Sequence, residues 1–123
     1  MNFKYKQEKT FEQREGEFQR ISRKYPDKIP VICEKDEKSK LNKIEKTKYL
    51  IEKALNLTQF SSIIRKKLDI IDEKNALFFL VNGKITISGS VTMADIYKRY
   101  KDKDGFLYIA YSSEETWGNK IFS

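Results

Sequence analysis

The sequence predicts an α+β fold for a single domain, and three observations indicate this class. Segments with the 3.6-residue periodicity of helices alternate along the chain with short runs that have the two-residue alternation of strands. The length of 123 residues is the usual size of one domain with a core of modest size. Aromatic residues make up 13% of the chain and supply much of the volume that such a core needs.

Two helical segments are predicted at the N-terminus. In residues 10–25, Phe11, Phe18 and Ile21 fall on one face of a helix, with charged and amide side chains elsewhere. Residues 3–9 are a shorter basic segment that would form a separate helical turn. We therefore expect helices to precede the first strand.

Two strands follow, and they predict a hairpin. Residues 29–35, with the sequence IPVICEK, alternate so that Cys33 faces one side of a sheet while Pro30 and Ile32 face the other. The proline indicates an edge strand or the start of a strand. Residues 48–53, with the sequence KYLIEK, form the second strand after a charged connection.

The second half of the chain alternates helices and strands. An apolar stripe predicts a helix at 56–68, and the continuous apolar run at 76–82 predicts a central strand that is buried on both faces. An Asn-Gly turn ends this strand. A short helix at 92–100 begins at a capping threonine, and residues 106–111 form the final strand.

This order of elements predicts a ubiquitin-like β-grasp with two additional N-terminal helices. Two strands are followed by a helix that crosses back to a further strand of the same sheet. In such a fold the helix packs on one face of the sheet, and the other face needs its own cover. The N-terminal helices would bind on that second face or leave a groove there.

The residue types in the chain argue against an enzyme. The chain has no histidine, which excludes histidine general bases, histidine-activated nucleophiles and histidine metal ligands. Its one cysteine, Cys33, allows no intramolecular disulfide and is expected to be a small buried apolar residue. No glycine-rich phosphate-binding motif is present. We expect neither catalytic activity nor a cofactor or metal.

Charge and hydropathy indicate where the chain is found. The formal net charge is +7, but charges of both signs are interspersed, as on an ordinary soluble surface, so no nucleic-acid partner is expected. The first ten residues, MNFKYKQEKT, lack the apolar segment of a signal peptide. No stretch approaches the roughly 20 apolar residues of a membrane-spanning helix. We expect the chain to be cytosolic or nuclear as made.

The end of the chain raises a question about its purpose. A polar run at 112–116 follows the last strand, and Trp117, Gly118 and residues 119–123 come after it. For an arbitrary chain, the favoured interpretation is a frayed terminus with an incidental glycine.

Several ordered blocks carry a resemblance to a known family. The blocks are KYPDKIPVICEK, KYLI, IRKKL, ALFFLVN, DKDGFLYIAYS and the Trp-Gly pair near the end of the chain. In this order they resemble the GABA-receptor-associated-protein (GABARAP) family of ubiquitin-like autophagy modifiers, also called the autophagy-related protein eight family. The resemblance runs from about residue 3 to Gly118, nearly the whole chain.

The resemblance implies a function as a modifier and adaptor rather than as an enzyme. A processing cysteine protease would recognise Trp117 and Gly118 and cut after the glycine. Ubiquitin-type activating and conjugating enzymes would then join the Gly118 carboxylate to phosphatidylethanolamine. The lipidated protein would leave the cytosol for the autophagosomal or vesicle membrane and recruit receptors that carry aromatic-x-x-aliphatic peptides. Tubulin is a further candidate partner.

The same resemblance implies a peptide site along the exposed edge of the second strand, with a pocket on each side. The first pocket would take the aromatic anchor and be lined by Glu17, Ile21, Pro30, Ile32, Lys48, Leu50 and Phe106. The second would take the aliphatic anchor and be lined by Tyr49, Ile51, Leu55, Phe60 and Ile63. Acidic residues of the ligand would meet Lys28, Lys46, Lys48 and Lys67. Leu50, Phe60 and Ile63 have an alternative role as ordinary core residues.

Read with this resemblance, the chain divides into four parts. These are an N-terminal helical subdomain (1–28), a β-grasp core (29–112), a flexible conjugation tail (113–118) and a removable peptide (119–123).

The chain departs from the family pattern at three places. Glu52 stands where the family usually has proline, the 83–92 loop lacks a Pro-Pro pair, and Trp117 replaces Phe or Tyr. Two alternative functions stay open from the sequence. One is a ubiquitin-like peptide-binding adaptor that is never conjugated. The other is a basic module that binds tubulin or nucleic acid through its lysines.

Overall fold

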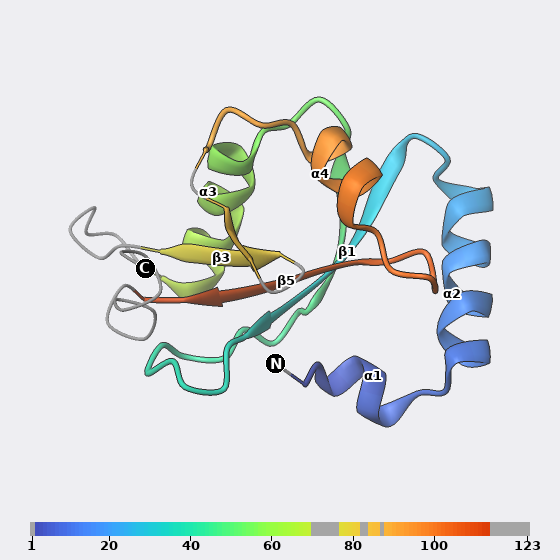
Figure 1. The fold of residues 1–123 in the computed structure, drawn as a ribbon, viewed down its shortest axis with the longest axis horizontal. Helices are drawn as coiled ribbons and strands as arrows, with labels where there is room; N and C mark the ends of the chain where they lie inside the picture. Colours follow the sequence, from blue (N-terminus) through green and yellow to red (C-terminus); the bar gives the residue numbers. More distant parts are fainter. Residues whose placement is uncertain (1, 70–76, 82–83, 87, 114–123) are drawn as a thin grey trace.

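The structure, a computed structural model, describes residues 2–69, 77–81, 84–86 and 88–113. They form a five-stranded mixed sheet with two helices on one face, one on the other face and one at the end of the sheet (Figure 1). The elements are α1 (Lys4–Glu8), α2 (Phe11–Lys24), β1 (Lys28–Lys35), β2 (Lys48–Glu52), α3 (Leu57–Leu68), β3 (Phe78–Val81), β4 (Lys84–Thr86), α4 (Met93–Tyr100) and β5 (Leu107–Ser112).

The strands follow the order β2-β1-β5-β3-β4 across the sheet. β1 and β2 pair antiparallel, which confirms the predicted hairpin. β5, the last strand, lies parallel to β1 at the centre of the sheet, and β3 pairs antiparallel with both β5 and β4. This topology, with α3 as the crossover, confirms the predicted α+β fold: a ubiquitin-like β-grasp with two additional N-terminal helices.

Polar side chains fix where three of the helices begin. The Thr10 hydroxyl accepts a hydrogen bond from the Gln13 backbone N–H, and the Gln13 side chain accepts one from the Thr10 backbone, so α2 starts with a capping box. Asn56 and Gln59 do the same for α3. Thr92 caps α4, as its position in the sequence predicted. In the described part of the chain, no helix has the length and apolar character needed to cross a membrane.

The main core lies between the sheet and the pair α3 and α4. Phe60 of α3 and Met93 of α4 are completely buried against alternate residues of the central strands. Cys33 of β1 is buried in this cluster, which confirms that it packs as a small apolar residue. Its burial also raises the pKa of the thiol well above the ordinary value.

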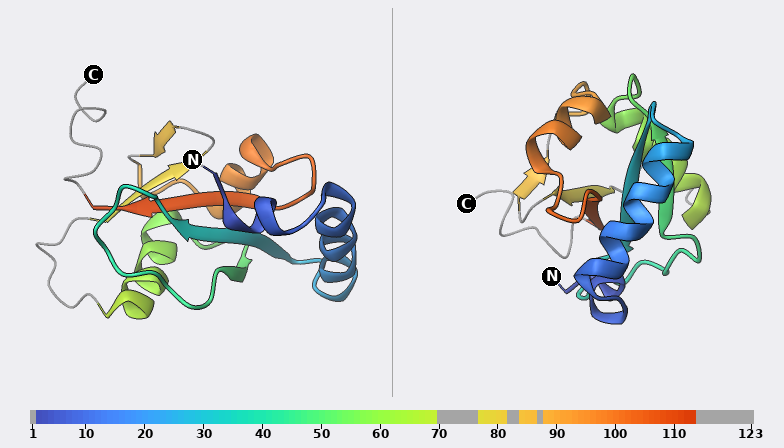
Figure 2. Two further views of the ribbon diagram at one scale, coloured as in Figure 1. Left: turned by 90° about the horizontal axis from the view of Figure 1, so that it is seen from below. Right: turned by 90° about the vertical axis from the view of Figure 1, so that its right-hand side faces the viewer.

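The N-terminal helices cover the opposite face of the sheet. Ile32, Phe106 and Tyr108 point to this side and form a second apolar cluster with Tyr5 of α1, against which Phe18 of α2 also packs. The Tyr5 and Phe106 rings meet edge to face, with centroids 5.4 Å apart. α1 therefore lies across the sheet, whereas α2 stands at one end of the molecule (Figures 1 and 2).

A buried polar network attaches the N-terminal helices to the loop between α4 and β5. Asp104 has no exposed surface, and its Oδ2 accepts from Arg14 Nε at 3.0 Å and from the Tyr108 hydroxyl. Its Oδ1 accepts from the Phe106 backbone N–H at 2.9 Å. The Arg14 guanidinium also donates to the carbonyl of Lys6 in α1 and to the carbonyl of Lys9 in the segment that joins α1 to α2. One side chain of α2 thus holds α1, α2 and the loop before β5 together.

Some predictions about individual elements are wrong. The strand within the 76–82 run is β3, which lies fourth in the order across the sheet and is not central. Its residues alternate between buried and half-buried positions, and Phe78 and Leu80 are half-buried. Ala76 and Asn82 lie outside the described residues. The short strand β4 was not predicted, because a three-residue strand is too short to show a period.

Phe11 differs from expectation, whereas the position of Pro30 confirms one of its two predicted alternatives, the start of a strand. Phe11 was expected on the buried stripe of α2 but is 38% exposed. It lies in the first turn of α2 and is not among the residues that pack against the second apolar cluster. Pro30 is not on an edge strand, because β1 lies between β2 and β5. It is near the start of β1, where pairing with β5 begins only at Val31, so its missing N–H breaks no bond of that ladder.

Candidate peptide-binding site

The site predicted from the sequence follows β2, the last strand on one side of the sheet. β2 pairs with β1 on one side, and no described strand pairs with its outer edge. Its residues alternate, so Tyr49 and Ile51 are buried while Lys48, Leu50 and Glu52 are exposed. An open edge with backbone donors and acceptors is a template for an added strand.

The structure brings together the seven residues assigned to the first pocket. In the β1–β2 register Pro30 lies opposite Leu50 and Ile32 lies opposite Lys48. Phe106 and Ile32 are completely buried in the second apolar cluster, and Ile21 of α2 packs against it. Leu50 is 39% exposed, a high value for a large apolar side chain in this protein. These residues lie between the β2 edge and α2, and we call this surface the α2–β2 groove, after the groove that the family resemblance implies.

Charged residues close one side of the α2–β2 groove. The Lys48 ammonium on β2 donates to the Glu17 carboxylate on α2, and Lys9 pairs with the other Glu17 oxygen at 3.7 Å. Burial alone would raise the pKa of the Glu17 carboxyl, but the hydrogen bond and charge of Lys48 outweigh it and hold the pKa below its usual value. Glu17 is therefore ionised at neutral pH and holds two lysines at the groove.

The Tyr5 ring lies beneath this ion pair and was not predicted as a site residue. The Lys48 Nζ sits 5.5 Å from the centroid of the Tyr5 ring, and the Lys9 Nζ sits 5.9 Å from it. Burial, followed by the nearby Glu17 charge, raises the pKa of the Tyr5 phenol. The only sequence signal was the alternation of aromatic and lysine residues in FKYK, which does not show which lysine of a distant strand would meet the ring.

The second predicted pocket is placed differently. Tyr49, Ile51 and Phe60 are buried in the main core, and the Tyr49 and Phe60 rings meet edge to face at 6.4 Å. Leu55 and Ile63 are partly buried and pack against the same core. In this structure a ligand would therefore meet Leu55 and Ile63 first, while the other three support the strand and helix from beneath.

The four predicted lysines are not equivalent. Lys28 pairs with Glu52 at 3.3 Å, so the glutamate that replaces the family's proline holds a lysine of the neighbouring strand. Lys46 places its ammonium 5.1 Å from the Tyr49 ring. Lys67 is exposed in the last turn of α3. Lys48 lies on β2 and Lys46 lies just before it, where acidic ligand residues would meet both lysines.

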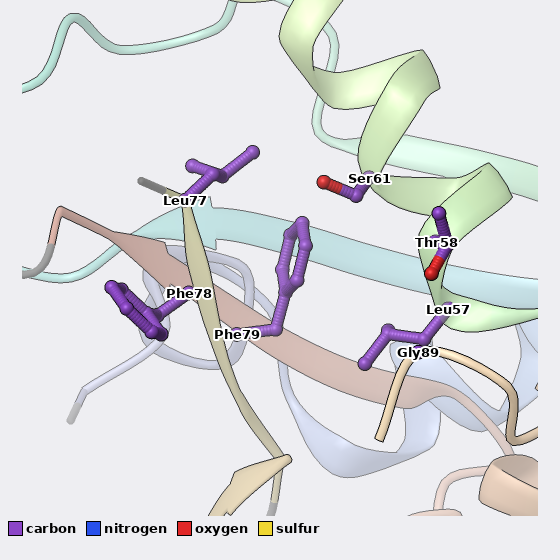
Figure 3. A pocket seen from close by; sticks show the side chains of 7 residues that line it. All are labelled: Leu57, Thr58, Ser61, Leu77, Phe78, Phe79 and Gly89. Carbon is purple, nitrogen blue, oxygen red and sulfur yellow. The ribbon is translucent and has the colours of Figure 1, made fainter. Parts of the chain in front are cut away.

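A separate pocket of about 360 Å³ lies between α3 and β3, on the side of the sheet away from the α2–β2 groove (Figure 3). We call it the α3–β3 pocket. Its lining residues are Leu57, Thr58, Ser61, Leu77, Phe78, Phe79 and Gly89.

The predicted cleavage and conjugation residues, Trp117 and Gly118, lie outside the described residues. The last strand, β5, ends at Ser112.

Comparisons with known proteins agree with this fold. A family model described as "Autophagy protein Atg8 ubiquitin like" matches residues 13–118. Autophagy-related protein 8 of Coccidioides immitis is 47% identical over 119 residues, covering 97% of this chain and all of that protein. Autophagy-related protein 8 of Phaeosphaeria nodorum is 46% identical, covering 98% of this chain and all of that protein.

A solved structure is similar over the same range. The crystal structure of Trypanosoma brucei ATG8 superimposes with a TM-score of 0.86 at 38% identity, covering 93% of this chain and 97% of that one. The chain therefore belongs to the Atg8 family of ubiquitin-like autophagy proteins.

Proposed function

We propose that this chain is cleaved after Gly118 and joined through that residue to phosphatidylethanolamine. A cysteine protease removes residues 119–123 and leaves the Gly118 carboxylate. The activating enzyme joins this carboxylate to the AMP portion of ATP and releases pyrophosphate, and a cysteine thiol then displaces AMP to form a thioester. The conjugating enzyme takes over the thioester, and the lipid amine displaces the thiol to form an amide. The observation that supports this proposal is that the family match ends at Gly118, six residues beyond the end of β5.

The conjugated lipid anchors the modified chain to membranes. A single acyl chain holds a protein only marginally, whereas two acyl chains anchor it stably. The unmodified protein is then cytosolic, and the conjugate resides on autophagosomal membranes. The chain itself acts as the substrate of these steps and not as their catalyst.

Intact mass of the protein recovered from its own cells tests the cleavage and the conjugation together. The expected species are a chain that ends at Gly118 and the same chain with the added lipid. Gly118→Ala should stay full-length and diffuse in the cytosol, because a Cβ is added where two enzymes need close approach. Asn119→Ala, one residue beyond the cut, is the matched control and should be processed and form membrane puncta. Punctate, membrane-bound Gly118→Ala would mean that the chain acts without conjugation.

We further propose that the α2–β2 groove binds aromatic-x-x-aliphatic peptides of autophagy receptors. The outer edge of β2, with which no described strand pairs, and the exposed Leu50 on that strand support this. An extended peptide adds to the edge strand through backbone hydrogen bonds, and its aromatic anchor covers Leu50, Pro30 and Ile21. Lys46 and Lys48 attract acidic residues of the peptide and chiefly raise the association rate.

Calorimetry with a synthetic peptide tests the groove. Leu50→Ala should weaken binding by about 2 kcal/mol or more, the scale of a hot-spot loss, because Leu50 is the apolar side chain that a ligand would cover. Phe11→Ala is the control, because Phe11 is 38% exposed, close to the 39% of Leu50, but does not pack in the second apolar cluster. Equal affinities of the two variants would place the peptide site elsewhere. Tyr49→Ala is unsuitable, because Tyr49 is a core residue here.

A further inference from the structure

Tyr5 of α1 carries a buried hydroxyl group that makes no hydrogen bond with any described residue. The residue is 8% exposed and its hydroxyl oxygen is shielded from solvent, so water does not replace a protein partner. Buried polar groups nearly always have a partner, because an unpaired group loses its hydrogen bonds to water without compensation. An unpaired hydroxyl beside a binding surface therefore points to a second arrangement, in which it has a partner.

The position of this hydroxyl is fixed from two sides. The backbone N–H groups of Lys4 and Tyr5 donate to the two Glu34 side-chain oxygens, at 2.7 Å and 3.1 Å. The Tyr5 ring packs edge to face on Phe106, and its centroid lies 6.5 Å from that of the Tyr108 ring. Because the hydroxyl lies on the long axis of the ring, the same contacts hold the hydroxyl in place. A new partner must therefore come to Tyr5.

Two acidic groups act on the Tyr5 phenol, and one of them is already occupied. Burial raises the pKa of this phenol, and the charges of Glu17 and Asp104 raise it further. The Asp104 oxygens accept three hydrogen bonds, from the Arg14 guanidinium, the Tyr108 hydroxyl and the backbone N–H that follows the next residue. Asp104 is completely buried with these donors, so it is not the group that becomes free.

Glu17 is the other acidic group, and its partners are able to leave. The Lys48 ammonium donates to Oε1 of Glu17, and the Lys9 ammonium lies 3.7 Å from Oε2. These two lysine side chains are 43% and 42% exposed, whereas the Glu17 side chain is 15% exposed. Both ammonium groups also lie over the Tyr5 ring, so the ring and the carboxylate share them. A negative charge that drew Lys48 outward would leave Oε1 without a donor, close to the unpaired hydroxyl.

We propose that Tyr5 is a positioning residue of the α2–β2 groove, whose hydroxyl donates to Glu17 when a carboxylate of the ligand takes Lys48. This proposal rests on the peptide binding proposed above for the groove. In the free protein Glu17 competes with the ligand for Lys48 and so opposes binding. The new hydrogen bond from Tyr5 offsets the lost ion pair, and it gives the buried hydroxyl its partner. No proton is transferred between Tyr5 and Glu17.

The exchange makes Tyr5 a determinant of ligand specificity. A peptide with aspartate beside its aromatic anchor engages Lys48 and releases Glu17, so its binding includes the hydrogen bond from Tyr5. A peptide with asparagine at that position leaves Lys48 on Glu17 and does not use the hydroxyl. A hydrogen bond to a charged acceptor changes an equilibrium constant by about tenfold or more. The preference for the acidic peptide therefore depends on a hydroxyl that the peptide does not touch.

Urea unfolding of the full chain tests the exchange without any ligand. Lys48→Met imitates the capture of Lys48, and the Tyr5→Phe change is then measured with and without it. In the wild-type background Tyr5→Phe removes an unpaired hydroxyl, so the equilibrium constant of unfolding should stay the same or fall. In the Lys48→Met background the hydroxyl is paired with Glu17, and Tyr5→Phe should raise this constant about tenfold.

Lys46→Met is the matched control background. Lys46 is two residues before Lys48, but its ammonium lies over the Tyr49 ring. Tyr5→Phe should therefore act in the Lys46→Met background as it does in wild type. A hydroxyl with a purely structural role would have one effect in all three backgrounds, and that result would overturn the proposal.

Calorimetry with two synthetic peptides then tests the role in binding. The peptides differ only in aspartate or asparagine directly before the aromatic anchor. Tyr5→Phe should weaken binding of the aspartate peptide about tenfold and that of the asparagine peptide less than twofold. Equal weakening of both peptides would overturn the positioning role of Tyr5. If neither peptide bound to wild type, the proposed peptide site would be wrong, while the unfolding measurements would still decide whether Tyr5 pairs with a released Glu17.

Discussion

Replacement of Arg14 by methionine should cost more stability than any exposed ion pair of this protein supplies. Arg14→Met keeps the apolar length of the side chain but removes the guanidinium that faces Asp104. The Arg14 side chain is 11% exposed and the Asp104 carboxylate 0%, so water cannot replace the lost partner. The change leaves a buried charge with only the Tyr108 hydroxyl and one backbone N–H to stabilise it.

The magnitude follows from the burial of Asp104. Loss of one partner of a buried ion pair typically destabilises a protein by about 3–5 kcal/mol, because the other charge remains uncompensated. The lower end of that range is expected here, since two hydrogen bonds to Asp104 remain. The double variant Arg14→Met with Asp104→Asn removes both charges and should recover a large part of the loss.

Urea unfolding followed by circular dichroism measures this loss, and Lys6→Met is the control. Lys6 of α1 pairs at 2.6 Å with Asp102, which lies in the same loop as Asp104. Both side chains are partly exposed, at 38% for Lys6 and 26% for Asp102. Its loss should cost about 1 kcal/mol. Faster amide exchange at Tyr5 in Arg14→Met would show that α1 has loosened. Equal stability of Arg14→Met and Lys6→Met would refute the reasoning that burial makes the Arg14–Asp104 pair strong.

Three further predictions rest on single residues. Cys33→Ala should destabilise the protein by about 1–2 kcal/mol without changing its processing, and native Cys33 should resist thiol reagents that modify it in urea. Gly105→Ala should cost about 2 kcal/mol or more, since φ is 100° and the added Cβ would lie 2.3 Å from the Phe18 ring, whereas helical Gly16→Ala should stabilise by about 0.5–1 kcal/mol. The pKa of Glu17 is lowered in the folded state, so wild type should be more stable than Glu17→Gln at neutral pH. This stability difference should begin to fall below about pH 4.5 and should disappear as the pH falls through the lowered pKa of Glu17 in the folded protein. Urea unfolding at a series of pH values checks this last prediction, and a constant difference from pH 7 to pH 3 would contradict it.

Local signals explain which parts of the fold were predictable. The α4 cap at Thr92 and the β1–β2 hairpin each depend on residues close together in sequence, and both are confirmed. The alternation in IPVICEK placed Ile32 and Cys33 on opposite faces, where they join different apolar clusters. The groove residues of the first predicted pocket came from the family resemblance, because no periodicity indicates that α2 and β2 meet.

Contacts between distant segments were not predictable from the sequence. Arg14 and Asp104 are separated by 90 residues, and neither stands out among the 25 basic and 18 acidic residues of the chain. The same holds for Tyr5 beneath Lys48, which depends on how α1 lies across the sheet. Phe60 and Tyr49 were assigned to a pocket, yet a large apolar residue next to a binding edge serves equally well as core.

The α2–β2 groove depends on the buried network of Arg14 and Asp104 through α2. Glu17 and Ile21 form the groove wall, and Arg14, one turn before Glu17, holds that helix to Asp104. The β2 edge is attached separately, through its ladder with β1. Loosening of α2 would therefore leave the strand edge available but remove the wall on which an aromatic anchor packs. A ligand of this groove would lose its anchor contacts before its backbone hydrogen bonds, so its affinity depends on a buried ion pair that the ligand never touches.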